Sequence, residues 1–160
     1  MSVDIRIPKG VAEELRRKAD DLGLSIVEYI IEIALQGLDP SNRTKKYAES
    51  ALELLKHAKE ELKKGNLRQA SEKIWGATAL AIKAYASWRE GKRITSHSEL
   101  WEYERILTKD IGDWVDDSWR HAVTMHVNFY EGWASREHVE RSLEKVEKLV
   151  IAIIKRIEHR

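Results

Sequence analysis

Cysteine is absent from this chain of 160 residues, and that absence limits its chemistry. Without a thiol there is no disulfide, no thiolate metal ligand and no cysteine nucleophile, and we expect a protein of the reducing cytoplasm. The chain also lacks any run of about 18 apolar residues, so we expect no membrane span. Its first residues lack the charged and apolar regions of a signal peptide.

Proline, glycine motifs and clustered metal ligands are also scarce. The two prolines, Pro8 and Pro40, are both expected to lie outside helices. The six histidines lack the spacing of a zinc site, and the chain has neither a glycine-rich phosphate loop nor the Gly-x-Ser-x-Gly motif of hydrolases. We therefore expect no metal and no cofactor. A net charge of +1 gives no overall electrostatic argument for nucleic acid.

Helical periodicity dominates what is present. From about residue 44 to the end, apolar residues recur at steps of three and four, which is the pattern of helices that bury one face. We therefore predict an all-α fold in which residues 44–160 form an antiparallel bundle of four long helices and one shorter helix. Ser96 and Ser135 are expected to cap two of these helices. Many alanines between residues 67 and 89 predict a close approach of the first two bundle helices.

The first 38 residues follow a different pattern. Val3, Ile5 and Ile7 alternate with polar residues, which predicts a short strand over residues 3–8. Two short helices are expected next, the second opened by a capping box at Ser25 and ended at Gly37. Residues 39–43 are expected to be a linker to the bundle.

This order of strand, helix, turn and helix resembles the ribbon-helix-helix module, in which two chains pair their strands and place them in the DNA major groove. The resemblance implies that Asp4 and Arg6, with Lys9 behind them, face DNA. Residues 1–38 hold five Lys or Arg and seven Asp or Glu, a net charge of −2, whereas phosphate binding favours a basic surface. We therefore expect an arm that dimerises the chain in preference to one that reads DNA.

The strongest functional signal lies between about residues 113 and 132. An apolar stripe places His126 on a face expected to be buried, with Arg120 and His121 at its edge; the stripe is Val115, Trp119, Ala122, His126, Phe129 and Trp133. Taken singly, these residues are best read as a hydrogen-bonded core histidine and a solvated arginine. The four tryptophans from Trp101 to Trp133 indicate an aromatic core, with a base-stacking wall in a nucleotide cleft as the alternative.

Taken together, the pattern Arg, polar residue, four residues, His resembles the signature of the HEPN superfamily of helical domains. Three further words resemble the archaeal PaREP family (type one), a HEPN branch, over about residues 44–160: Ala70–Ala77, His97 with Glu99–Trp101, and His126–Glu131. The resemblance implies a bundle in which Arg120, His121 and His126 of two protomers combine in one catalytic cleft. Other residues expected along that cleft are Arg93, His97, Asn128 and Tyr130.

The chemistry available to such a site is metal-independent cleavage of RNA. RNA supplies the 2′-hydroxyl as nucleophile, a histidine can move protons near neutral pH, and an arginine can hold phosphate oxygens. We therefore expect a homodimer or higher oligomer that acts as a toxin-like endoribonuclease on RNA, with a cognate antitoxin as a further candidate partner. The alternatives are a non-catalytic nucleotide- or RNA-binding module and a DNA-binding regulator.

Overall fold

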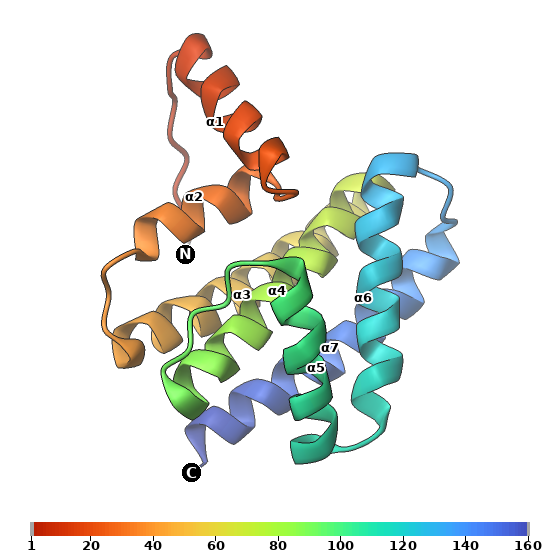
Figure 1. Cartoon of the computed structure of the whole chain (residues 1–160). Helices are drawn as coiled ribbons and strands as arrows, with labels where there is room; N and C mark the ends of the chain where they lie inside the picture. The colour runs from red at the N-terminus through yellow and green to blue at the C-terminus, as the bar shows by residue number, and fades with distance from the viewer. Residues whose placement is uncertain (1, 160) are drawn as a thin grey trace. The chain divides into compact units, whose positions relative to one another are not determined.

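The computed structural model describes residues 2–159, all of whose regular structure is helical (Figure 1). The helices are α1 (Lys9–Asp21), α2 (Ile26–Leu35), α3 (Pro40–Lys63), α4 (Leu67–Glu90), α5 (His97–Ile111), α6 (Trp114–Glu131) and α7 (Arg136–Glu158). The described chain divides into two compact units between Asp39 and Pro40. The prediction of an all-α fold is confirmed, and no described helix is long and apolar enough to cross a membrane.

The N-terminal unit contains α1 and α2, and the strand predicted for residues 3–8 is not present. These residues have no regular structure, since a strand is defined by hydrogen bonds to a second strand and the described chain offers none there. Val3 and Ile5 are each 78% exposed. The predicted cap of α2 is confirmed, because the Ser25 hydroxyl accepts a hydrogen bond from the Glu28 amide at 3.1 Å.

Pro40 corrects two predictions, since it begins α3 and residues 40–43 form its first turn instead of a linker. A proline fits the first position of a helix because the amide it lacks would have had no partner there. Its carbonyl accepts hydrogen bonds from the hydroxyls of Thr44 at 2.7 Å and Ser87 at 2.9 Å. Arg43 donates to Ser87 at 3.2 Å and to the Gly91 carbonyl at 2.9 Å. The start of α3 is therefore fixed to the end of α4.

Helix α4 is the centre of the second unit. It contacts α3, α5, α6 and α7, and it is buried on nearly all sides from Ala70 to Ser87. Its sequence alternates larger apolar residues with alanine, serine, threonine and glycine, so neighbouring helices can approach closely all around it. Trp88, which was expected on the buried seam, lies only half-buried near its end.

Helices α5, α6 and α7 complete the bundle. The predicted caps are confirmed, because Ser96 accepts from the Glu99 amide and Ser135 from the His138 amide, each at 3.2 Å. Helix α6 contacts α4, α5 and α7, so different faces of this one helix lie against different neighbours. Trp133 was expected on the buried stripe of α6, but the helix ends at Glu131 and the Trp133 side chain is 51% exposed.

Candidate functional site

His126 lies on α6 within a cluster of rings contributed by three helices. Its imidazole stacks on Trp75 of α4, with ring centroids 4.6 Å apart and planes 29° apart. His97, in the first turn of α5, stacks on the same indole at 5.5 Å and lies 5.1 Å from His126. We call Trp75, His97 and His126 the histidine–tryptophan cluster. It brings together two histidines that are 29 positions apart in the sequence.

Burial controls the charge of this cluster. Removal from water, and secondarily the nearby His97, lower the pKa of His126 from 6.5 to about 4. His126 is therefore neutral at pH 7 and has a lone pair free to accept a proton or a hydrogen bond. The Nε2 atom of His97 is buried and has no hydrogen-bond partner among the described residues. Polar atoms in such positions are uncommon in folded proteins.

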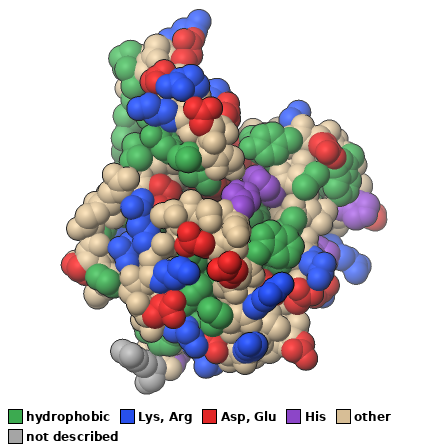
Figure 2. All heavy atoms as spheres, in the orientation of Figure 1, with side chains coloured by type: hydrophobic (Ala, Val, Ile, Leu, Met, Phe, Trp, Pro, Cys, Tyr) green, Lys and Arg blue, Asp and Glu red, His purple; other side chains and the backbone are tan. Residues whose placement is uncertain are grey.

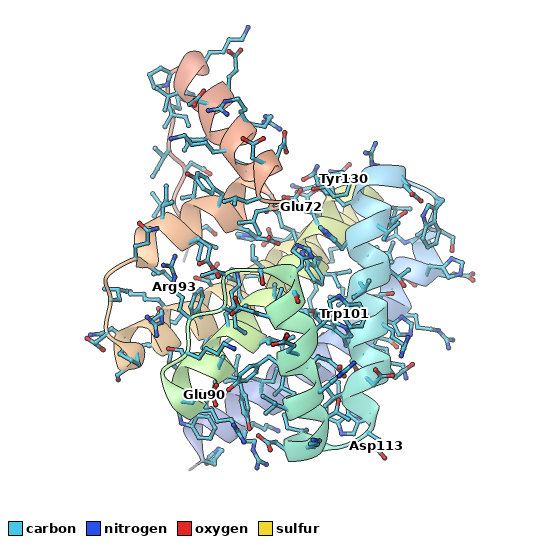
Figure 3. The ribbon with its side chains drawn as sticks, in the orientation of Figure 1. Glu72, Glu90, Arg93, Trp101, Asp113 and Tyr130 are labelled. Atoms are coloured by element: carbon cyan, nitrogen blue, oxygen red, sulfur yellow. The ribbon has the colours of Figure 1, made fainter. Side chains whose placement is uncertain are left out.

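Two exposed aromatic side chains border the cluster. Tyr130, 52% exposed, meets His126 edge-on at 5.6 Å, and Trp101, 43% exposed, meets the buried Trp119 edge-on at 5.1 Å. Figure 3 labels both residues, which lie on α6 and α5. Figure 2 shows histidine side chains, in purple, at the surface beside large apolar side chains near the middle of the view. The two half-buried imidazoles therefore lie in an exposed surface that is rich in aromatic rings.

Arg120 and His121 lie on other faces of α6. Six residues along a helix separate Arg120 and His126 by ~120° around its axis. The Arg120 side chain is 68% exposed, and its Nε donates to Asp116 one turn earlier at 2.8 Å. The Nδ1 of His121 forms a hydrogen bond with the Ser142 hydroxyl of α7 at 3.0 Å. The three residues of the motif therefore do not converge on one point within a single chain.

Asn128, expected along the cleft, is a buried structural residue that is only 1% exposed. Its amide donates to the Ser71 hydroxyl at 2.8 Å and accepts from the Ala134 amide at 2.7 Å. These bonds use the side chain to fix the loop between α6 and α7, so it does not face a ligand. Arg93, also expected along the cleft, is half-buried in the loop between α4 and α5.

The arm residues named as DNA contacts all lie at the surface of the N-terminal unit. Asp4, Arg6 and Lys9 are exposed, and Lys9 lies 3.9 Å from Glu13 in an exposed ion pair. An exposed pair of this kind contributes little stability. Among residues 2–159 there is also no group of three or more His, Asp or Glu side chains able to hold a metal ion.

Sequence reasoning missed one residue of this site. Trp75 was noted within a family-like word but was given no role, although it is the ring on which both histidines stack. For Trp101 an aromatic core was preferred to a base-stacking wall, whereas 43% of the residue is exposed. No local pattern separates an exposed tryptophan from a buried one. The three short family-like sequences that contain Trp75, Trp101 and His126 were the signal that could have indicated a shared site.

Comparison with known proteins gives one match. The model of the archaeal PaREP1/PaREP8 family matches residues 46–150. No curated protein and no solved structure matches the chain. The matched region contains all of α4, α5 and α6, and with them the whole histidine–tryptophan cluster. The chain therefore belongs to the archaeal PaREP1/PaREP8 family.

Proposed function

We propose that this protein is a HEPN-type helical protein that binds RNA at the histidine–tryptophan cluster and cleaves it there. One observation carries the proposal: His97 and His126 lie 5.1 Å apart in a surface bordered by the exposed rings of Trp101 and Tyr130. Paired imidazoles are suited to proton transfer, and exposed aromatic rings are suited to stacking on unpaired bases.

Binding in this proposal depends on stacking more than on charge. The chain carries a net charge of only +1, so a general attraction to phosphate is weak. Stacking of a base on an aromatic side chain contributes about 1–3 kcal/mol and needs little sequence specificity. Trp101 and Tyr130 would therefore bind single-stranded or looped RNA, in which bases are free to leave the stack.

Cleavage would use the hydroxyl that RNA itself supplies. The neutral His126 accepts the proton of a 2′-hydroxyl as that oxygen attacks the adjacent phosphorus. The bond from phosphorus to the 5′-oxygen breaks, and a second group, for which His97 is placed, gives the leaving oxygen a proton. The products are a 2′,3′-cyclic phosphate and a 5′-hydroxyl. Arg120 would hold the phosphate oxygens only from a second copy of the chain, because it faces away from His126 in its own chain.

A non-catalytic RNA-binding module is the second candidate, and the pKa of His126 favours it. A general base acts best when its pKa lies near the working pH, and burial holds His126 at about 4. Such an imidazole is a good hydrogen-bond acceptor but a weak base. In that case the cluster would recognise a base or a ribose hydroxyl without cutting the strand.

The deciding experiment incubates structured and unstructured RNA with the wild type, His126→Ala and the control His159→Ala, all in EDTA. His159 lies at the exposed end of α7, away from the cluster. We expect cyclic phosphate ends from the wild type and the control, and none from His126→Ala. Equal background cleavage by all three proteins would refute catalysis. A weakened RNA affinity in Tyr130→Ala would then support the binding module.

We also propose that residues 3–8 pair with the same segment of a second chain. Val3 and Ile5 are each 78% exposed, and residues 3–8 belong to no strand among the described residues. A lone short strand is not stable in water, whereas an antiparallel pair buries its alternating side chains. Such pairing would make the homodimer that the Arg120 arrangement requires.

A further inference from the structure

A second surface on α6, away from His126, combines cations with an exposed indole. It is a depression of about 290 Å³ between α6 and α7. Arg120, His121, Trp133, His138 and Arg141 are among its lining residues. We call it the α6–α7 depression. None of these five residues takes part in the histidine–tryptophan cluster.

One cation of this depression, Arg141, is available to an anion. Arg141 has no ion pair or hydrogen bond with any described residue. The lining carboxylate, Asp117, is already neutralised by Lys145 at 2.9 Å, and the hydrogen bond from that lysine lowers the pKa of Asp117. An arginine that is not already paired can grip phosphate oxygens with two parallel hydrogen bonds.

The two histidines add ring nitrogens held in fixed directions. His121 uses Nδ1 for the Ser142 hydroxyl at 3.0 Å, and His138 uses Nδ1 for the Ser135 hydroxyl at 2.8 Å. Each hydrogen bond fixes its ring and leaves Nε2 uncommitted. Hydroxyl partners of this kind orient an imidazole as they do in metal and phosphate sites. The depression therefore presents fixed imidazole nitrogens from two separate helices.

Trp133 supplies a surface for a flat ring. It lies in the loop between α6 and α7, is 51% exposed, and touches His138 edge-on with ring centroids 6.5 Å apart. That loop is held in place by the buried Asn128, so the indole is presented on a fixed segment. An indole half exposed beside the unpaired Arg141 is suited to stacking on a nucleobase.

We propose that the α6–α7 depression binds a nucleoside phosphate, with the base on Trp133 and the phosphate on Arg141. The volume of about 290 Å³ suits one nucleotide and not a strand. This goes beyond RNA cleavage at the histidine–tryptophan cluster, which lies on another face of the same helix. A bound nucleotide would bridge α6 and α7 and would therefore be a small-molecule ligand of the bundle itself.

The test is isothermal titration of the full chain with AMP, adenosine and inorganic phosphate. The variants are Arg141→Ala, Trp133→Ala and the control Arg136→Ala, whose guanidinium is paired with Glu140 and does not line the depression. We expect Arg141→Ala to weaken the binding of AMP about tenfold or more, because the variant loses a charge-assisted hydrogen bond to the phosphate. Trp133→Ala should weaken the binding of AMP but not that of inorganic phosphate. Arg136→Ala should change neither affinity.

A second measurement locates the ligand. In spectra of the protein labelled at histidine nitrogens, AMP should shift the signals of His121 and His138 and leave those of His97 and His126 in place. Equal AMP affinity in the wild type and Arg141→Ala would overturn the proposal, as would binding of an RNA oligonucleotide without binding of AMP. His126→Ala should retain AMP binding, so failure here is distinguishable from failure of the proposed cleavage.

Discussion

Replacing His126 with phenylalanine would separate the packing of its ring from its titration. The phenyl ring can still stack on Trp75, but it cannot take a proton. In the folded protein the pKa of His126 is lowered to about 4, mainly because the ring is withdrawn from water. The unfolded chain binds a proton at this position near pH 6.5. The neutral, folded form is therefore fully stabilised above pH 6.5, and that stability is lost as the pH falls toward 4.

The size of the effect follows from the two pKa values. One pKa unit corresponds to about 1.4 kcal/mol, so the interval from 6.5 to about 4 sets an upper limit of roughly 3.5 kcal/mol. The ring is only partly buried, and hydration of its exposed part reduces the expected value to roughly 1–2 kcal/mol. Most of this loss should be present at pH 5, where the unfolded histidine is protonated and the folded one is not.

Urea unfolding at pH 7.5 and pH 5 measures this loss. The wild type should lose roughly 1–2 kcal/mol more stability over that interval than His126→Phe does. The control His159→Phe changes an exposed histidine at the end of α7 and should behave as the wild type. Equal losses in the wild type and His126→Phe would refute the reasoning, because the imidazole would then be as well hydrated in the folded protein as in the unfolded chain.

Three further predictions test the packing and the assembly. Asn128→Ala should lower stability by about 2–4 kcal/mol in thermal or urea unfolding, since it removes both hydrogen bonds of a buried amide; an unchanged melting temperature would mean that the loop after α6 is held by other contacts. Ala81→Leu should cost about 1–3 kcal/mol, because the larger side chain has no space on the buried α4, and an unaltered unfolding curve would contradict that burial. The double variant Val3→Asp with Ile5→Asp should lower the mass measured by light scattering if the arms pair, whereas an unaffected mass would exclude pairing through residues 3–8.

The helix starts were largely predictable because their signals are local. A serine at a cap bonds an amide three residues later, so Ser25, Ser96 and Ser135 report on their own neighbourhoods. Pro40 was placed outside a helix because proline is disfavoured in a helix interior. Proline is favoured at the first position of a helix, which is where Pro40 lies. One of the two hydrogen bonds to its carbonyl comes from Ser87, which no pattern near Pro40 could reveal.

The site was harder to predict because its contacts are not local. The approach of His97 to His126 depends on α5 and α6 lying together, and short words of sequence carry no such distance. Asn128 lies two residues after His126 and was placed in the cleft, but its direction on the helix turns it to Ser71 instead. Arg141 was not considered, because a lone arginine on a charged helix resembles any solvated one.

Helix α4 also affects how the family can vary. Its small side chains set the spacing of α3, α5, α6 and α7 at once, so one enlarged residue would displace the helices that carry both surfaces. Its amides should therefore be the last to exchange with solvent, because opening them requires the whole bundle to separate. Surface residues of α5, α6 and α7 do not set the spacing between helices. New binding properties can consequently arise on these three helices while α4 stays nearly constant in volume.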